Sequence, residues 1–279
     1  MTHPRWSLAG LGESGKTLDL PAASGRWNNA CVPALFVVSD VHGHLADLRD
    51  GLRGAGLLDA DDRWVGEDAE LWVLGDLTDR GPDGLGVVDL MRSLQEQAPS
   101  QVHVLMGNHE ALALGRALFP ESRFTDVWRR NGGLERDQRG LTPAHLDWMR
   151  RLPVVGRSHG FLLVHADTLD YLEWGESVAD INATVTELLA DDDAEAHWEV
   201  FAMLSGRYGF AHEDGVEAAR DMLSALGGEC LVHGHSIIGS LVAKRSEEIE
   251  GPMAYADGLV VAIDGGRYDG GPLLVVQLA

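Results

Sequence analysis

From residue 34 onward the chain repeats one pattern: a short apolar run, a turn containing glycine or aspartate, and then an amphipathic stretch. Short runs rich in β-branched residues predict strands, and apolar residues spaced by roughly 3.6 positions predict helices. Because the two alternate along the chain, the pattern favours an α/β fold. We expect strands at 34–39, 71–75, 102–106, 161–165, 230–234, 259–263 and 273–277. We expect helices at 46–58, 84–97, 144–152, 178–189 and 216–226, with Thr142 as the N-cap and Pro143 in the first turn of the third.

The length of 279 residues allows one large domain or two small ones. Hydrophobic residues make up 45% of the chain and charged residues 24%, which is the balance of a globular protein. Residues 1–33 show no sustained period, so we expect them to form an irregular leader. Residues 34–279 are then expected to form a single domain.

The charge balance limits the partners that the chain can have. The 22 basic and 44 acidic residues give a net charge of −22, so a nucleic acid would be repelled. No run approaches the roughly 18 apolar residues of a membrane span, and the N-terminus lacks the apolar core of a signal peptide, so we expect a cytoplasmic protein without a membrane partner. Cys31 and Cys230 lie beside apolar residues, which suits reduced, buried thiols, although a bridge between them stays open.

The segment 10–17 (GLGESGKT) fits the P-loop pattern GxxxxGK[ST]. A P-loop needs a buried strand before it and a helix after it. Here Pro4 and polar residues precede the glycines, and Pro21 follows Thr17 by four positions. We therefore interpret the segment as a glycine-rich surface stretch, and we do not expect the protein to be a P-loop nucleoside triphosphatase.

Polar side chains follow the predicted strands at the points where the strands end. In open α/β sheets, ligands bind in the crevice outside the carboxyl ends of the strands, so these side chains mark a candidate site. Asp40 and His42 follow the first strand, and their two-residue spacing places them on one side. The other positions are Asp76 after the second strand, Asn108 and His109 after the third, His165 at the end of the fourth, and His233 and His235 at the end of the fifth.

Each cluster has a second interpretation when it is taken alone. The segment 75–81 could be a turn with a salt-bridged arginine, and 107–110 could be a helix N-terminus with Asn108 as N-cap and Glu110 in the first turn. A single histidine is more often structural. The joint order of Asp, His, Asp, Asn, His and His, each at a strand end, instead favours a site for two divalent transition metals, which such mixed ligands suit.

The motifs SDVHGH (39–44), GDLTDRG (75–81) and GNHE (107–110), together with His165, resemble those of the calcineurin-like metallophosphoesterases. Within that family the chain resembles the bacterial relatives of the phosphoprotein phosphatases, including the Shewanella-like phosphatases. The resemblance extends from about residue 34 to the segment IDGGRYDGGPL (263–273). It implies two packed mixed β-sheets flanked by helices, in four α/β/β/α layers.

The resemblance also implies the metal ligands. The first metal would be held by Asp40, His42 and Asp76. The second would be held by Asp76 as the bridge, with Asn108, His165 and a late histidine. The pattern G-H-[ST] of the family fits residues 234–236, so we choose His235 over His233 as the last ligand.

Two positions depart from the wider family. Many metallophosphoesterases have a histidine two residues after the late one, whereas this chain has Ile237, as the phosphoprotein phosphatases do; water would then complete the first metal site. The protein phosphatases tend to have glycine directly after the histidine at position 165. This chain continues with Ala166 and Asp167, which affects the assignment of the substrate rather than the metal ligand.

Further roles follow from the same resemblance. Arg80 would bind phosphate oxygens in a bidentate manner, which its planar guanidinium allows. His109, held by Asp79, would donate a proton to the leaving oxygen, provided that the carboxylate keeps the imidazole charged. Arg207 is a candidate second phosphate-binding arginine by position alone. The segment from about 168 to 228 supplies no ligand and is expected to form a helical cap over the site.

The function implied is that of a dinuclear metal-dependent phosphatase of the phosphoprotein phosphatase type, which hydrolyses phosphoric monoesters of Ser/Thr or Tyr by direct attack of a metal-bridging hydroxide. Manganese would serve as the metal in vitro, with iron or zinc as alternatives. The substrate is then a phosphorylated protein or a small phosphate ester. The alternative enzyme is a hydrolase of diadenosine polyphosphates or other small phosphoanhydrides, which shares these motifs. A catalytically dead scaffold predicts a lost ligand, and all six positions are filled.

Overall fold

The computed structural model of the protein describes residues 33–190 and 192–279. The interpretation of residues 1–32 as an irregular leader, the P-loop-like segment within them and Cys31 lie outside the described residues. Cys230 is a free cysteine, and burial raises the pKa of its thiol to about 11.

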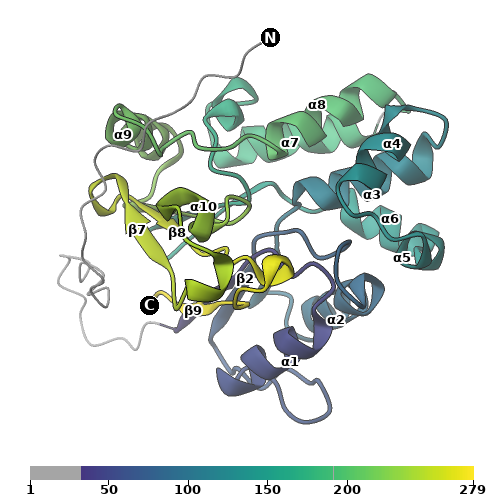
Figure 1. The fold of residues 1–279 in the computed structure, drawn as a ribbon, viewed down its shortest axis with the longest axis horizontal. Coiled ribbons are helices and arrows are strands. Elements are labelled where there is room, and N and C mark those ends of the chain that lie inside the picture. Colours follow the sequence, from purple (N-terminus) through teal and green to yellow (C-terminus); the bar gives the residue numbers. More distant parts are fainter. Residues whose placement is uncertain (1–32, 191) are drawn as a thin grey trace. The chain divides into compact units, whose positions relative to one another are not determined.

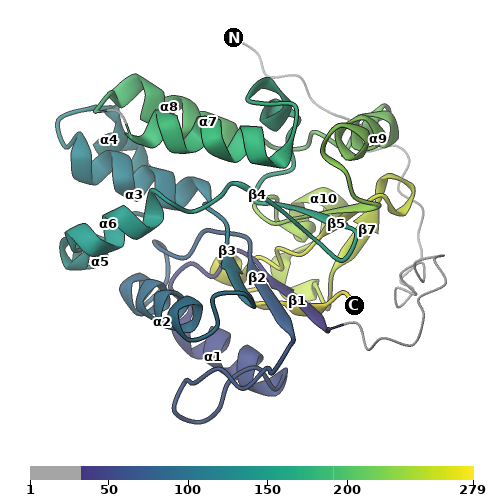
Figure 2. The same cartoon turned by 180° about the vertical axis from the view of Figure 1, so that it is seen from behind.

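The first sheet has four strands in the order β3-β2-β1-β9 (Figures 1 and 2). Its parallel strands β1, β2 and β3 coincide with strands expected from the sequence, and β9 pairs antiparallel with β1. The bounds of these strands are β1 (Leu35–Val38), β2 (Glu70–Val73), β3 (Val102–Val104) and β9 (Val275–Gln277).

The second sheet has five strands in the order β4-β5-β6-β8-β7. Strands β5, β6 and β8 are parallel, whereas the edge strands β4 and β7 pair antiparallel with their neighbours. The bounds are β4 (Val155–Ser158), β5 (Phe161–Val164), β6 (Cys230–His233), β7 (Met253–Tyr255) and β8 (Val260–Ala262). The sequence did not predict β4 or β7, because β4 ends in the polar residues Arg157 and Ser158 and β7 has only three residues.

The two sheets pack against each other. A Cβ atom at Gly156 on β4 would collide with the ring of Trp72 on β2, so the glycine leaves the space that this indole fills. Side chains such as Val73 of the first sheet and Leu162 of the second are fully buried in one continuous core. Two mixed sheets with flanking helices therefore confirm the predicted fold class.

Helices cover the sheets, and those expected from spacing form close to the predicted bounds. They are α1 (Leu45–Gly54), α2 (Gly84–Gln97), α6 (Pro143–Met149), α7 (Val178–Ala190) and α9 (Gly215–Leu226). Thr142 is the N-cap of α6, and Pro143 is its first residue, as predicted. The cap brings His145 close enough for its Nε2 to contact Asp89 Oδ1 on α2 at 2.9 Å.

The remaining helices were not predicted as such. They are α3 (Asn108–Leu118), α4 (Arg123–Arg130), α5 (Glu135–Gly140), α8 (Ala194–Leu204) and α10 (Ile238–Val242). Helix α3 is buried continuously over residues 108–115, so it shows no alternation of polar and apolar faces. Its N-cap is Gly107, not Asn108 as the helix-start interpretation supposed.

The segment expected as a cap contains helices α7, α8 and α9. Helices α7 and α8 lie side by side, with α8 against α3 and α7 against β4, whereas α9 packs on β6 (Figures 1 and 2). The role of residues 168–228 as a cap stays a prediction. Within residues 33–190 and 192–279, no helix is both long and apolar enough to cross a membrane.

Candidate metal centre and active site

Three glycines allow the loops that carry the polar residues to touch one another. A Cβ atom at Gly75 would lie 2.6 Å from the Cα of Gly107, and one at Gly107 would lie 2.5 Å from the backbone N of Asp76. A Cβ atom at Gly234 would collide with the carboxylate of Asp40. The absence of side chains at these positions therefore brings the ends of both sheets to one place.

The loops at this place hold several residues in the left-handed backbone region, with φ between 44° and 68°. Non-glycine residues adopt this region rarely, and such residues cluster at functional sites where the surrounding structure fixes them. The residues are Asp40, His42, Asp76, Asp79, Arg80 and His235.

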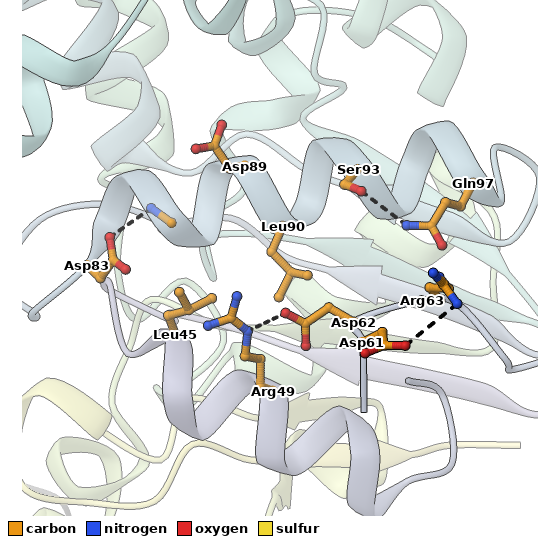
Figure 3. A pocket seen from close by; sticks show the side chains of 11 residues that line it. Leu45, Arg49, Asp61, Asp62, Arg63, Asp83, Asp89, Leu90, Ser93 and Gln97 are labelled. Carbon is orange, nitrogen blue, oxygen red and sulfur yellow. Dashed lines mark hydrogen bonds and ion pairs between the residues drawn. The ribbon is translucent and has the colours of Figure 1, made fainter. Parts of the chain in front are cut away.

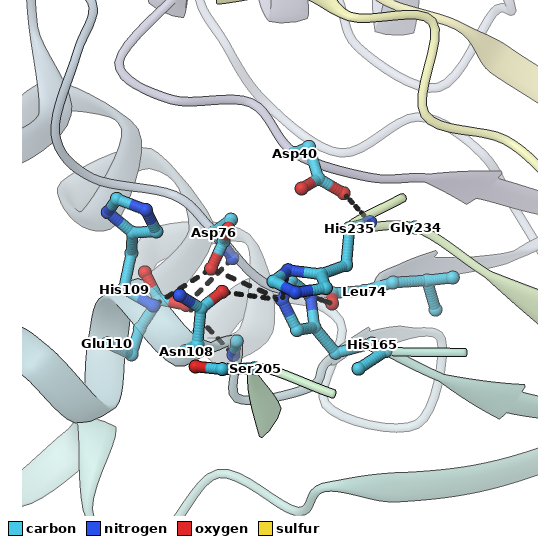
Figure 4. Close-up of polar contacts among 12 residues, drawn as sticks. Asp40, Leu74, Asp76, Asn108, His109, Glu110, His165, Ser205, Gly234 and His235 are labelled. Atoms are coloured by element: carbon cyan, nitrogen blue, oxygen red, sulfur yellow. Dashed lines mark hydrogen bonds and ion pairs between the residues drawn. The ribbon is translucent and has the colours of Figure 1, made fainter. Parts of the chain in front are cut away.

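One buried cluster joins ligands from both sheets (Figure 4). Asp40, Asp76, His165 and His235 each offer an atom within 4.8 Å of the others. His165 Nε2 lies 3.1 Å from His235 Nδ1, 3.1 Å from the Oδ1 of Asn108 and 3.5 Å from Asp76 Oδ1. The other ring nitrogen of His165 contacts the Leu74 carbonyl at 2.8 Å, which fixes the ring so that Nε2 faces the cluster.

A second buried cluster consists of His42, Asp76 and His109. His42 Nε2 lies 3.6 Å from Asp76 Oδ2, and its Nδ1 contacts the Thr78 carbonyl at 3.0 Å. Asp76 thus belongs to both clusters, which is the place expected of a bridging carboxylate.

The grouping differs from the expected one at Asp40. The sequence interpretation paired Asp40 with His42, whereas the structure groups it with His165 and His235. The reason is that Asp40 Oδ2 accepts a hydrogen bond of 2.8 Å from the backbone N–H of His235, which turns the carboxylate towards the end of β6.

The structure separates His235 from His233. The Nε2 of His233 contacts the Tyr255 hydroxyl at 2.8 Å and its Nδ1 contacts the Gly234 carbonyl at 2.8 Å, so both nitrogens are used within the second sheet. His235 lies in the cluster instead, and its buried Nε2 has no hydrogen-bond partner.

The electrostatics of the clusters suit a cation. Burial lowers the pKa of His165, and lowers the pKa values of His42 and His235 well below the ordinary imidazole value, so their nitrogens are neutral donors of lone pairs. Burial and the nearby charge of Asp40 raise the pKa of Asp76 well above its ordinary value. Neutral imidazoles and mutually repelling carboxylates in one buried space form a set that divalent metals bind.

His109 lies beside the clusters and is held by a carboxylate. Its Nδ1 is 2.8 Å from Asp79 Oδ2, and the Trp128 Nε1–H donates to Asp79 Oδ1 at 3.1 Å. The buried Nε2 of His109 has no hydrogen-bond partner and is available to a ligand. Trp128 is fully buried in the core and also orients Asp79 through this hydrogen bond.

Burial determines the proton affinities of this pair. It raises the pKa of Asp79 to about 7, and burial with the charge of Arg80 holds the pKa of His109 well below its ordinary value. An imidazolium at His109 therefore needs more negative charge nearby than Asp79 alone supplies.

Both predicted arginines lie at the site. Arg80 Nη1 is 2.9 Å from His42 Nε2, and its guanidinium carbon lies 3.9 Å from the centre of the ring of the exposed Tyr268. The exposed Arg207 donates from Nη1 to the carbonyl of His235. Two cationic groups therefore lie beside the carboxylates and imidazoles.

Sequence reasoning missed Asp264, which follows β8. This carboxyl is buried, its Oδ1 accepts from the Gly266 N–H at 2.8 Å, and its Oδ2 has no partner. Burial and the charges of Asp40 and Asp76 raise its pKa well above the ordinary value. The signal was present in the sequence, because an aspartate directly follows a predicted strand at 259–263, as it does at Asp40.

An open cavity of about 770 Å³ lies elsewhere, between α1, α2 and the loop at 59–63 (Figure 3). No residue of the metal clusters lines it. Its arginines pair with its aspartates, as Arg49 does with Asp62 at 2.7 Å and Arg63 with Asp61 at 3.6 Å. The cavity therefore does not compete with the clusters as the candidate site.

Known proteins resemble this chain in sequence. Shewanella-like protein phosphatase 2 of Arabidopsis thaliana is 33% identical over 81 residues, which are 28% of this chain and 21% of that protein. A symmetrical bis(5'-nucleosyl)-tetraphosphatase of Aromatoleum aromaticum is 28% identical over 167 residues, which are 58% of this chain and 54% of that protein. The matches thus span about a fifth to a half of the length of these relatives.

Solved structures share the fold. The cold-active protein-tyrosine phosphatase of a psychrophilic Shewanella species superposes with a TM-score of 0.64 at 19% identity, covering 89% of this chain and 76% of that one. A protein serine/threonine phosphatase from Saccharomyces cerevisiae gives a TM-score of 0.56 at 15% identity, covering 83% and 67%. At these identities the likeness shows the fold alone. The family model for calcineurin-like phosphoesterases matches residues 34–239, and the chain therefore belongs to that family.

Proposed function

We propose that this protein is a dinuclear metal-dependent phosphatase that hydrolyses phosphoric monoesters. The observation that carries the proposal is the shared place of Asp76 in two buried clusters of carboxylates and imidazoles. Arg80 and Arg207 beside those clusters supply positive charge for a phosphate. The partial sequence match to a Shewanella-like phosphatase supports a monoester as substrate.

The metals would be held by the residues of the two clusters other than His109, together with Asn108. Asp40, His165, His235 and the Asn108 side chain surround one position, and His42 faces the other. Two divalent cations, with manganese as the choice in vitro and iron or zinc as alternatives, would lower the pKa of water and neutralise phosphate charge.

The arginines would orient the phosphate. A guanidinium can donate two parallel hydrogen bonds to phosphate oxygens, which a lysine cannot. Stacking on Tyr268 and a hydrogen bond of 3.2 Å from Nε to the Asn131 carbonyl fix the plane of the Arg80 guanidinium. Arg207 would approach the phosphate from the loop after α8.

His109 would donate the proton that the leaving oxygen needs. Its Nδ1 is engaged by Asp79, so the proton moves from Nε2, the atom without a partner. The dianionic phosphate brings the further negative charge that favours an imidazolium there. This accounts for how a buried histidine with a lowered pKa serves as an acid.

A second function is favoured by a specific observation. The match to the symmetrical bis(5'-nucleosyl)-tetraphosphatase covers 58% of this chain, against 28% for the Shewanella-like phosphatase. The same two arginines and clusters could bind a phosphoanhydride, and a diadenosine polyphosphate is then the substrate.

A substrate panel tests the proposal. The manganese-loaded protein is assayed with p-nitrophenyl phosphate, phosphoserine, phosphothreonine and phosphotyrosine peptides, and diadenosine tetraphosphate, with the Asp76→Asn variant in parallel. We expect turnover of the monoesters to exceed that of the dinucleotide by at least about tenfold in kcat/KM. A reversed preference would establish the phosphoanhydride hydrolase, and no turnover of any of these substrates by the metal-loaded protein would overturn both.

A further inference from the structure

Asp167 lies in the segment where the sequence departs from the protein phosphatase pattern. It is fully buried, and both carboxylate oxygens and its backbone carbonyl accept hydrogen bonds. Its Oδ2 accepts a hydrogen bond of 2.9 Å from the backbone N–H of Tyr208. Its Oδ1 accepts from the hydroxyl of Ser236, and its carbonyl accepts from the Gly209 N–H at 2.7 Å. One residue thus connects the end of β5, the loop after β6 and the loop after α8.

The loop after α8 packs closely against residues 167–168. A Cβ atom at Gly206 would lie 2.6 Å from the Cβ of Thr168, and one at Gly209 would lie 2.8 Å from the Asp167 carbonyl oxygen. Neither contact leaves room for a side chain. The loop is therefore fixed at both ends of the dipeptide that contains Arg207.

Tyr208 adopts an unfavourable backbone conformation within this loop. Its φ of 64° lies in the left-handed region, which residues other than glycine rarely adopt. Its side chain is 46% exposed, so burial of the ring does not compensate fully. The hydrogen bond from its N–H to Asp167 is the contact that holds the backbone in place.

Arg207 lies between Gly206 and Gly209, the two residues that contact 167–168. It donates to the carbonyl of His235, and its charge acts on Asp76, His165 and Asp264. Ser236, the second partner of Asp167, directly follows His235. Asp167 therefore sets the position of the arginine relative to the metal cluster from both sides.

We propose that Asp167 is a positioning residue that holds Arg207 in the orientation in which it binds the substrate phosphate, an inference that rests on the proposed phosphatase function. Asp167 touches no substrate. Without it, the left-handed turn at Tyr208 relaxes and the guanidinium samples other positions, so affinity for phosphate is lost while the metal ligands stay in place.

The first experiment measures binding of inorganic phosphate to manganese-loaded protein by calorimetry. The variant Asp167→Ala is expected to bind phosphate about tenfold more weakly, with a matching rise in KM for p-nitrophenyl phosphate and unchanged metal content by elemental analysis. The matched control is Asp170→Asn, which removes an exposed carboxylate three residues away and should change neither quantity. Unchanged phosphate affinity in folded, metal-loaded Asp167→Ala would overturn the inference.

Two conservative variants, Asp167→Asn and Ser236→Ala, should lower the affinity for phosphate less than Asp167→Ala does. In Asp167→Asn the amide oxygen can accept from Tyr208 N–H while its nitrogen donates to the Ser236 hydroxyl, so phosphate affinity should recover to within about threefold of wild type. Ser236→Ala keeps the Tyr208 contact and should resemble Asp167→Asn. An Asp167→Asn variant as weak as Asp167→Ala would show that charge, and not the hydrogen bonds, is what matters.

A double-mutant cycle with Arg207→Ala separates this inference from the proposed function. If Arg207→Ala leaves phosphate affinity unchanged, the proposed role of Arg207 fails. If Arg207→Ala weakens binding, adding Asp167→Ala should weaken it no further, because the two residues act through one contact. Additive losses would overturn the inference alone. Should Asp167→Ala not fold, Asp167→Ser, whose side chain is too short to reach both partners, takes its place in the cycle under the same criterion.

Discussion

Asp76 is the one carboxylate on which both metal clusters depend, because its two oxygens face different groups of ligands. Oδ1 lies 3.5 Å from His165 Nε2 and accepts from the His109 backbone N–H at 2.9 Å, whereas Oδ2 lies 3.6 Å from His42 Nε2. The substitution Asp76→Asn should therefore lower the occupancy of both metals and reduce kcat on p-nitrophenyl phosphate more than any other single ligand change. Elemental analysis of the purified variant checks this, and full occupancy of two metals would show that Asp76 is not the bridge.

The pair of His109 and Asp79 separates acid catalysis from metal binding. The variant His109→Asn should keep both metals and lower kcat by roughly 10² to 10⁴ on phosphoserine peptides, the usual share of a general acid. The loss should be smaller on p-nitrophenyl phosphate, because p-nitrophenolate leaves without much protonation. Rates across a series of leaving groups measure the difference.

Asp79→Asn serves as the graded comparison for His109→Asn. It keeps the imidazole but removes the charge that holds it, so it should show the same dependence on the leaving group more mildly. An equal loss on every ester, or loss of metal in His109→Asn, would mean that His109 is a ligand or a structural residue.

At the scale of elements, the start of α3 and the turn after β2 share one carboxylate. Glu110 is fully buried; its Oε2 accepts from the backbone N–H of Asp76 at 2.8 Å and of Gly107 at 3.0 Å, and its Oε1 accepts from Leu77 N–H at 2.9 Å. Glu110→Gln supplies only one accepting oxygen and turns an amide N–H towards a donor. It should lower the free energy of unfolding by about 1–3 kcal/mol in urea titrations. Glu96→Gln, at an exposed position of α2, is the control that should change it little.

The same residue gives the fold a pH dependence. Burial, with the charge of Asp76, raises the pKa of Glu110 to about 7 in the folded state, above its value in the unfolded chain. The folded protein then binds more protons than the unfolded chain between these pKa values, so this group's contribution to stability falls as pH rises through that window. Metal-free wild type should lose more stability than Glu110→Gln between about pH 5 and pH 7. Equal slopes in urea titrations at several pH values would contradict the assignment.

For the whole molecule, the metals should be part of the stability. Asp40, Asp76 and Asp264 are buried, and the charge of Asp40 raises the cost of charging Asp76 and Asp264, which a cation would relieve. A metal at about 100 times its Kd adds roughly 2.7 kcal/mol, so manganese should raise the Tm of chelator-treated protein by about 5–10 °C. Asp76→Asn should show little of this shift in thermal denaturation. A Tm that does not respond to manganese in wild type would exclude tight binding.

The segment 10–17 tests whether residues outside the described part of the chain take part in turnover. A nucleotide-binding loop would depend on Lys16, whereas a surface stretch would not. Lys16→Ala should therefore leave phosphatase kcat/KM within about twofold of wild type. A loss beyond tenfold, or loss of nucleotide binding that the wild type shows, would restore the P-loop interpretation.

The sequence by itself determined the parallel strands and the chemistry at their ends. Runs such as 161–164 (FLLV) are apolar at every position because both faces of the strand are covered, and this is visible locally. The motifs with Asp40, Asp76 and Asn108 could be recognised because each places its glycine and ligand within a few residues. The order of ligands along the chain followed from those motifs.

Only the tertiary structure decided which groups meet. The sequence pattern favoured His235 over His233, but it could not show that His233 is engaged by Tyr255, which lies 22 residues further along the chain. Asp40 turns towards His235 through a hydrogen bond across 195 positions of the chain. Helix α3 has no polar face because the helices α4 and α8 cover it, and the roles of Asp167 and Asp264 depend on loops from distant segments. Local patterns record the burial of each residue, but not which partner buries it, because that partner is set by the packing of the two sheets.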